Sequence, residues 1–318
     1  MPTWQAGRSR RAFLRSAISV GGLVVLSTIG CGGEPSVPMP ETLPTTDNWP
    51  LNDLLVSASW LRERIDDPDL RVIDCTNIDR FRDGHLPRAR HVWWQDTIEI
   101  NNGVYGMMTG MPGREEIVRD TGITSDSTVV CYDDTGGVYA ARIIWMLHGM
   151  GFRGARLLDG GAGAWVRAGG SLTRDVTTVT SGGFVAQPTE EMLAHGHDIL
   201  AGLDRPDVIL LDTRTEDERE ETWYDRLRRG TIPGSRWLPS NEWLTNDDAP
   251  ALLPPGELRT RLVAAGVPLD TPEIVVYGLH GTLAALPYVT LLALGAPMVR
   301  VYDGAWAEWG ANPAWPIA

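Results

Sequence analysis

Short apolar runs alternate with amphipathic stretches along most of the chain, and the same alternation occurs twice. In the first half this pattern predicts strands over Leu70–Cys75, Thr128–Tyr132 and Ala155–Leu158, and helices over Arg114–Asp120 and Val138–Met150. In the second half it predicts strands over Val208–Asp212, Ile274–Tyr277 and Met298–Val301, and helices over Gly256–Ala265 and Leu286–Leu294. Short buried strands alternating with helices are typical of α/β domains, each a mostly parallel sheet flanked by helices.

The two halves also share motifs in the same order. Leu157–Trp165 and Val301–Trp309 each contain an Asp-Gly pair after an apolar run and end on a tryptophan. Their separation is about 144 residues, which is too long for a solenoid repeat and indicates a duplicated domain. The sequence therefore predicts one domain over residues 51–172 and a second over residues 189–318, joined by a Thr-, Ser- and Gly-rich linker over residues 173–188.

The N-terminus has the features of an export signal and lies outside both predicted domains. Arg10 and Arg11 stand in a basic segment that resembles the twin-arginine signal, and the apolar run that follows is too short to span a bilayer. Cys31 comes directly after this run, in a setting that resembles a bacterial lipobox. We therefore expect residues 1–30 to be an export signal and residues 31–50 a tether. The mature protein is expected in the periplasm or at the cell envelope, with a lipid anchor on Cys31.

Composition narrows the possible functions. The 318 residues have a formal net charge of -13 and 43% apolar residues, which disfavours nucleic-acid binding and intrinsic disorder. The three cysteines are too few for a disulfide framework or a cysteine-rich zinc site. His195 and His197 are two residues apart, which is poor spacing for a metal site. The sequence therefore predicts neither a metal nor a cofactor.

Several motifs resemble the tandem-domain rhodanese family, which comprises thiosulfate and 3-mercaptopyruvate sulfurtransferases. The resemblance covers nearly all of residues 56–310 and implies two tandem rhodanese-like domains of α/β fold, the first of the non-catalytic type. The motifs that carry it are Val72-Ile73-Asp74, Gly84-His85-Leu86-Pro87, Asp212-Thr213-Arg214, Gly230-Thr231-Ile232-Pro233-Gly234-Ser235 and Tyr302-Asp303-Gly304-Ala305-Trp306. By the same resemblance His85 has a structural role.

In this family a cysteine follows the central strand of the second domain and carries sulfur as a persulfide. Gly278 stands at that position here, and Asp133 stands at the equivalent position of the first domain. Because glycine has no nucleophile, the transfer step is lost at this position. The resemblance still implies a site that binds a small sulfur-containing anion, formed by Gly278, Leu279, His280, Gly281, Thr282, Leu283, Asp212, Arg214 and Arg219.

Two functional interpretations follow. In the first, the protein is catalytically degenerate and binds a small sulfur oxyanion, or a protein partner, at the cell envelope. In the second, it remains an active sulfurtransferase that uses Cys75 or Cys131 as its thiol, with a small sulfur-containing anion or thiol as substrate. Both cysteines lie in or beside predicted strands, so buried core thiols are the simpler interpretation, with a Cys75–Cys131 disulfide as an alternative.

Two residues near Gly278 modify the expected site. Pro287 removes a helical hydrogen bond if it lies inside a helix, so we expect the helix to begin near Leu286. That leaves a long loop from Gly278 to Ala285. His280 has no cysteine, serine or carboxylate at motif spacing, and it is interpreted as a solvated loop residue.

Overall fold

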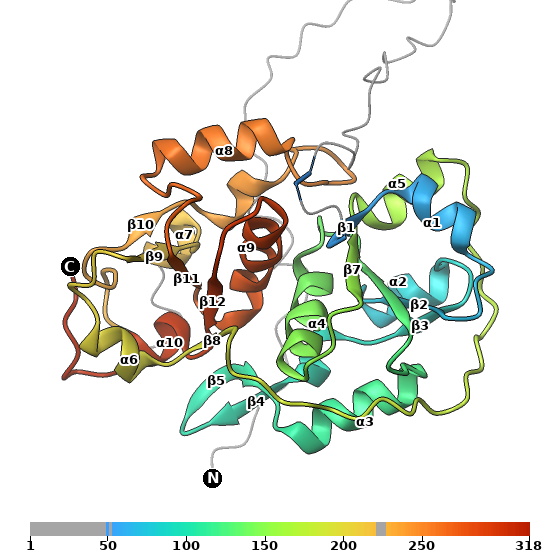
Figure 1. Ribbon diagram of the computed structural model, residues 1–318, viewed down its shortest axis with the longest axis horizontal. Coiled ribbons are helices and arrows are strands. Elements are labelled where there is room, and N and C mark those ends of the chain that lie inside the picture. Colours follow the sequence, from blue (N-terminus) through green and yellow to red (C-terminus); the bar gives the residue numbers. More distant parts are fainter. Residues whose placement is uncertain (1–48, 51–52, 221–226) are drawn as a thin grey trace, which may run out of the picture. The chain divides into compact units, whose positions relative to one another are not determined.

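The computed structural model describes residues 49–50, 53–220 and 227–318 (Figure 1). The predicted export signal, Cys31 and most of the predicted tether lie outside the described residues. Within the described part of the chain, no helix combines the length and the apolar character needed to cross a membrane.

The first half folds as a parallel five-stranded sheet with helices around it. The strand order is β1-β7-β6-β2-β3, and every neighbouring pair is parallel. The sheet strands are β1 (Leu55–Val56), β2 (Leu70–Asp74), β3 (Ala89–His91), β6 (Thr128–Tyr132) and β7 (Ala155–Leu158). The helices are α1 (Ala58–Arg64), α2 (Ile78–Asp83), α3 (Met111–Thr121), α4 (Val138–Gly149) and α5 (Gly161–Arg167), and a short 3-10 helix covers Trp94–Thr97.

The second half repeats this plan. Its strand order is β10-β9-β11-β12-β8, again with every neighbouring pair parallel. The strands are β8 (Leu193–Ala194), β9 (Val208–Asp212), β10 (Arg236–Trp237), β11 (Glu273–Tyr277) and β12 (Val299–Tyr302). The helices are α6 (Gly196–Ala201), α7 (Glu216–Glu220), α8 (Pro255–Ala264), α9 (Gly281–Ala293) and α10 (Ala305–Trp309), and a 3-10 helix covers Ser240–Trp243. Read from its other edge, the second sheet has the order β8-β12-β11-β9-β10, which corresponds strand by strand to the first sheet. This match confirms the predicted duplication of an α/β domain.

Burial explains why the central strands were visible in the sequence. β6 and β11 lie inside their sheets and are covered on both faces, so their side chains form continuous apolar runs. The predicted strands Thr128–Tyr132, Ala155–Leu158 and Val208–Asp212 match the structure at both ends. The two-residue edge strands β1, β8 and β10 carry no comparable signal, and sequence periodicity did not find them.

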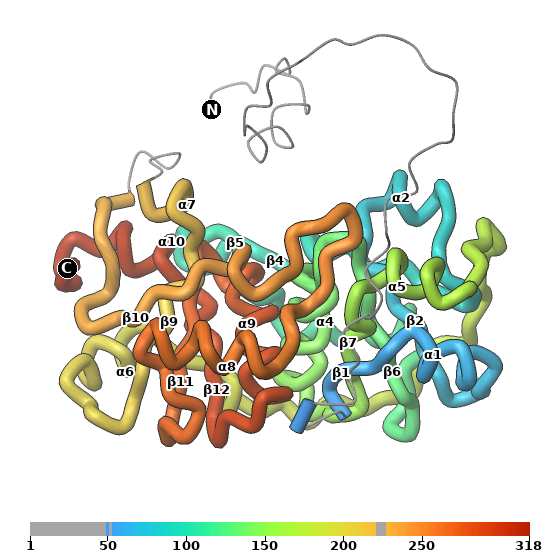
Figure 2. Tube along the Cα trace, turned by 90° about the horizontal axis from the view of Figure 1, so that it is seen from above, coloured from blue at the N-terminus to red at the C-terminus, as the bar shows by residue number. Residues whose placement is uncertain are grey.

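The two domains meet through their central helices. α4 and α9 pack against each other between the two sheets, and one hydrophobic cluster includes buried residues of both helices (Figures 1 and 2). Across this contact a hydrogen bond of 2.9 Å joins Nδ1 of His148 to the Tyr288 hydroxyl. Burial lowers the pKa of His148 to about 3, and Arg153 contributes to that decrease. His148 is therefore neutral at pH 7.

The position of α9 corrects one sequence prediction. α9 begins at Gly281 rather than near Leu286, and it contains Pro287 in its interior. The expected long loop from Gly278 to Ala285 is therefore absent, and only three residues separate β11 from the helix. Most side chains of α9 are buried, and helix stability in proteins comes mainly from such packing. Tertiary burial thus outweighs the hydrogen bond that proline removes.

Candidate functional site

The loop after β11 lies at the carboxyl end of the second sheet, where ligands bind in folds of this kind. β9 and β11 are neighbours, and Tyr277 pairs with Asp212 at their ends. The Thr213 amide and hydroxyl both donate to the Tyr277 carbonyl, at 2.8 and 3.0 Å. The structure therefore brings Gly278 beside the segment that contains Asp212 and Arg214.

Gly278 is buried, but there is space for a side chain. A Cβ placed on Gly278 would lie 3.2 Å from the His280 carbonyl oxygen, 3.5 Å from the Thr213 hydroxyl and 3.6 Å from the Leu283 Cβ. Gly278 is not among the glycines with positive φ, so a side chain adds no left-handed strain here. Its side chain would face the first turn of α9, which contains Leu283. This is the position at which the resemblance to the rhodanese family places a nucleophile.

The first domain shows what the equivalent loop does when a side chain is present. The Asp133 carboxylate accepts hydrogen bonds from four backbone amides of its own loop and of the first turn of α4. The donors are Thr135, Gly137 and Tyr139, each at 2.8 Å, and Ala140 at 3.0 Å. Burial raises the pKa of the Asp133 carboxyl, while these four bonds act in the opposite direction. Asp133 thus fills an anion cradle from within the chain.

The second domain has the equivalent helix start, where the Asp303 carboxylate lies against Gly281 but is paired with Arg142 rather than bound to the helix amides. Among the described residues, no acceptor takes a hydrogen bond from the amides of Gly281, Thr282 or Leu283 in the first turn of α9. The Thr282 hydroxyl is also buried and has no partner within the described part of the chain. A buried hydroxyl without a partner is costly, so these donors suit a ligand that accepts hydrogen bonds.

Asp212 and Arg214 form a buried ion pair beside this loop. Arg214 Nη2 lies 2.7 Å from Asp212 Oδ2, and both side chains are fully buried. The Arg214 guanidinium also stacks on the Trp306 ring at 4.2 Å. Arg219 Nε lies 3.6 Å from the same carboxylate, and its guanidinium stacks on Trp237 at 4.7 Å. Arg219 is 30% exposed, so it is the most accessible cation of the predicted set.

His280 is not a solvated loop residue, which corrects the sequence interpretation. It precedes α9 and is half-buried under the hairpin formed by β4 (Ile98–Asn101) and β5 (Val104–Met108) of the first domain. A Cβ on Gly106 would lie only 2.9 Å from the His280 Cβ, and the Tyr105 ring meets the imidazole edge-on at 5.8 Å. Burial, followed by the charge of Arg142, lowers the pKa of His280 to about 4.

A buried ion pair between the domains holds this hairpin in place. Arg142 of α4 is fully buried, and its Nη1 lies 3.1 Å from Asp303 Oδ1 of the second domain. Arg142 also donates to the Gly106 carbonyl at 3.2 Å, and the Met108 amide donates to Asp303 Oδ2 at 2.6 Å. In the sequence Asp303 stood out only as part of a repeated motif, and Arg142 was missed. The sequence indication for Arg142 was an arginine within a predicted helix whose other residues are mostly apolar.

Asp159 is the counterpart of Asp303 in the first domain. It accepts a hydrogen bond at 2.9 Å from the Leu252 amide, which belongs to the second-domain arm, residues 244–253. Leu244 of that arm packs against Gly136 in the Asp133 loop. Each domain therefore extends an arm over the loop of the other. The contacts of Asp159 and Asp303 differ, because Asp303 is paired with Arg142 whereas no ion pair reaches Asp159 among the described residues. Burial raises the pKa of Asp159 to about 6.

We expect Asp159→Asn to stabilise the protein at pH 7.5 by up to about 3 kcal/mol, the value that corresponds to a pKa rise from 3.8 to about 6. The charged carboxylate costs stability above pH 6, and that cost disappears as the pH falls towards 3.8. The gain should therefore be close to zero at pH 4. Urea unfolding at both pH values measures it, with Asp53→Asn as the exposed control. An equal gain at pH 4 would contradict the explanation.

Cys75 and Cys131 are both free and fully buried. Cys131 of β6 pairs with Ile73 of β2, and Cys75 follows directly after the end of β2, so the two thiols are neighbours. Burial, together with the neighbouring Cys131 thiol, raises the pKa of Cys75 well above its ordinary value. The thiolate is the nucleophilic form of cysteine, and a buried neutral thiol does not meet a dissolved sulfur donor. This geometry does not support either cysteine as a replacement nucleophile.

Comparisons with known proteins agree with the architecture. The rhodanese-like domain family matches residues 57–168 and 196–312. A probable 3-mercaptopyruvate sulfurtransferase of Pseudomonas aeruginosa is 33% identical over 281 residues, covering 83% of this chain and 97% of that protein. The 3-mercaptopyruvate sulfurtransferase of Escherichia coli is 29% identical over 276 residues, covering 82% and 96%.

A solved structure shows the same fold at lower identity. The anaerobic ergothioneine biosynthesis enzyme from Chlorobium limicola, in complex with trimethyl histidine, superposes with a TM-score of 0.74 at 21% identity. The match covers 85% of this chain and 71% of that one. The two family matches coincide with the two repeated sheets, and the two sulfurtransferases align over almost their whole length. The chain therefore belongs to the rhodanese-like sulfurtransferase family, with two such domains in tandem.

Proposed function

We propose that this protein is a catalytically degenerate rhodanese that binds a small sulfur oxyanion, such as thiosulfate, in the loop of its second domain. The observation that carries the proposal is the contrast between Asp133 and Gly278. In the first domain a carboxylate occupies the amide cradle, whereas in the second the same position has no side chain. Its relatives are named for 3-mercaptopyruvate and thiosulfate, which makes a sulfur-containing anion the natural occupant.

The donors around Gly278 fit such an anion. Helix N-termini favour anions because their first amides lack partners and the helix dipole is positive there. The amides of Gly281, Thr282 and Leu283, together with the Thr282 hydroxyl, supply neutral donors at the start of α9. Arg219 is the partly exposed cation closest in sequence to the buried Asp212–Arg214 pair. Without a thiol at Gly278, binding proceeds without transfer of the sulfane sulfur to the protein.

We expect thiosulfate to raise the melting temperature of the wild-type protein without releasing thiocyanate from thiosulfate and cyanide. At about 100 times its Kd, a ligand that binds only the folded state adds about 2.7 kcal/mol of stability. Gly278→Asp places a carboxylate in the second cradle, as Asp133 does in the first, and should abolish the shift. Gly278→Ala adds only a methyl group and should keep it. An equal shift in the Asp variant, or turnover by the wild type, would count against the proposal.

We also propose export by the twin-arginine route and lipid anchoring at Cys31, which the arginine pair and the apolar run before Cys31 support. A reporter fused to residues 1–35 is expected to leave the cytoplasm of a bacterium that has this pathway. Changing Arg10 and Arg11 together to Lys should stop export, and Cys31→Ser should leave export intact while removing the lipid. Unchanged export of the double Lys variant would contradict the assignment.

A further inference from the structure

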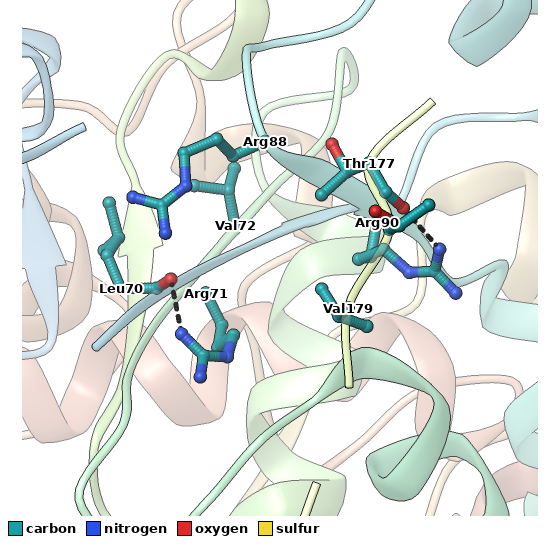
Figure 3. A pocket seen from close by; sticks show the side chains of 8 residues that line it. Leu70, Arg71, Val72, Arg88, Arg90, Thr177 and Val179 are labelled. Atoms are coloured by element: carbon teal, nitrogen blue, oxygen red, sulfur yellow. Dashed lines mark hydrogen bonds between the residues drawn. The ribbon is translucent and has the colours of Figure 1, made fainter. Parts of the chain in front are cut away.

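Arginine side chains bind two kinds of partner in this structure. A cavity of about 90 Å³ lies between β2 and the linker, and Arg71, Arg88 and Arg90 surround it (Figure 3). Each of the three donates to a backbone carbonyl of a different segment, and their head groups point to different sides. They fasten loops and the linker to the first sheet. Arg142 differs from them, because its partner is the carboxylate of Asp303 in the other domain.

Asp303 lies directly beside the loop proposed to bind the anion. It follows β12, the neighbour of β11, and the Trp306 amide after it donates to the Gly278 carbonyl at 3.1 Å. A Cβ placed on Gly281 would overlap Asp303 Oδ1. The carboxylate therefore lies against the first residue of α9, the helix whose first amides are the proposed anion donors.

The first domain engages both oxygens of this carboxylate. Arg142 Nη1 lies 3.1 Å from Asp303 Oδ1, and the Met108 amide donates to Oδ2 at 2.6 Å. Arg142 is fixed in turn by the Gly106 carbonyl at 3.2 Å and by the Thr97 hydroxyl at 3.4 Å. Because both oxygens of Asp303 bind groups of the first domain, they do not take up the amides at the start of α9.

A carboxylate without these partners would have a different effect on the loop. In the first domain the Asp133 carboxylate accepts four amides at the equivalent helix start, from Thr135, Gly137, Tyr139 and Ala140. A negative charge held in a buried position acts strongly on its surroundings, because little water screens it. An unpaired Asp303 would therefore repel an incoming anion or occupy the donors that the anion needs.

The other charged groups around this pair do not change its sign. Arg114 donates to the Thr109 carbonyl at 2.5 Å, and Glu99 accepts the Gly110 amide at 3.1 Å, so one positive and one negative charge are added. Burial, followed by the charge of Arg142, lowers the pKa of His280 to about 4, and His280 is neutral at pH 7. The charge at the start of α9 thus depends on whether Asp303 is paired.

We propose that Arg142 is a positioning residue of the second-domain anion site. It holds Asp303 away from the amides at the start of α9 and cancels its charge, which leaves those amides to the anion. This role rests on the proposed function of the Gly278 loop. It makes the site complete only when the two domains are packed together, because the arginine belongs to one domain and the donors to the other.

Asp303→Asn separates this role from a structural one, because the two roles predict opposite changes. The substitution leaves the buried Arg142 unpaired, so the melting temperature without ligand should fall. The affinity for thiosulfate, measured by calorimetric titration, should nevertheless rise about threefold or more, since a net positive charge then faces the start of α9. Asp159→Asn changes the equivalent carboxylate of the first domain and should leave the affinity as it is, and Gly278→Asp supplies the blank.

The introduced thiol of the Gly278→Cys variant gives a second readout, which does not need thiosulfate binding by the wild type. Its alkylation rate as a function of pH gives the thiol pKa, which a nearby positive charge lowers. Adding Asp303→Asn should lower that pKa, adding Arg142→Gln should raise it, and adding Arg142→Lys, which keeps the charge, should change it least. Asp159→Asn is again the control and should not move it.

The outcomes distinguish this role from the function of the loop. If the wild type binds no thiosulfate but the thiol pKa shifts as expected, the proposed function fails and the electrostatic role of Arg142 stands. If the wild type binds thiosulfate, weaker binding by Asp303→Asn or an unmoved thiol pKa would show that Arg142 only holds the domains together, and the positioning role would be wrong.

Discussion

Arg142→Leu is expected to lower the free energy of unfolding by about 3–5 kcal/mol, because it leaves a buried carboxylate without its cation. Asp303 is almost fully buried and would keep only the Met108 amide as a donor from the hairpin. The Gly106 carbonyl would lose its bond to Arg142 as well. Urea denaturation measures the loss. Hydrogen exchange should also rise in β4 and β5, since the hairpin is held to the second domain at this point.

The matched control for Arg142→Leu is the double variant Arg142→Leu with Asp303→Asn, which removes both charges. It should recover a large part of the lost stability, because an apolar or neutral replacement of a whole buried pair is far less costly than loss of one partner. A conservative Arg142→Lys variant tests geometry, since lysine offers no planar fork to reach Thr97, Gly106 and Asp303 together. If Arg142→Leu unfolds at the wild-type urea concentration, the ion pair does not hold the domains.

Gly278→Cys is expected to create sulfurtransferase activity that, under the proposed function, the wild type does not have. The new Cβ meets its nearest neighbours at 3.2 to 3.6 Å, so the side chain fits with a shift of a few tenths of an ångström. Its thiol would face the start of α9, where the helix dipole and free amides lower a cysteine pKa. The thiolate would attack the sulfane sulfur of thiosulfate, the S–S bond would break, and sulfite would leave with the electron pair.

The persulfide formed on the introduced thiol of the Gly278→Cys variant is directly measurable. Intact mass should increase by one sulfur atom after thiosulfate treatment, and cyanide should remove that atom as thiocyanate. Gly278→Ser has similar size without a sulfur nucleophile, and it should show neither signal. A folded Gly278→Cys protein whose thiol reacts with a labelling reagent but never gains sulfur would show that the cradle has lost its alignment. That result would also remove the main support for anion binding by the wild type.

Much of the fold was predictable because its signals are local. Buried parallel strands produce continuous apolar runs, and the repeated Asp-Gly segments indicated the duplication and its order. The absence of a nucleophile at Gly278 also needs no structure, since it follows from the residue type and the family motif. The predicted start of α9 near Leu286 was wrong, which shows the limit of local rules. Pro287 by itself disfavours a helix, but packing against α4 outweighs that preference.

The order of residues predicts a duplicated rhodanese-like protein with a glycine, Gly278, at the position where the resemblance places the sulfur-carrying cysteine. The way in which each domain covers the loop of the other depends on tertiary packing. The contacts concerned are the hairpin over His280, the pair of Arg142 and Asp303, and the hydrogen bond from the Leu252 amide to Asp159. These contacts join residues about 100 to 200 positions apart, and no periodic pattern of polar and apolar residues encodes a partner at that distance. They form when two sheets bury α4 against α9, because that packing brings charged groups together out of water.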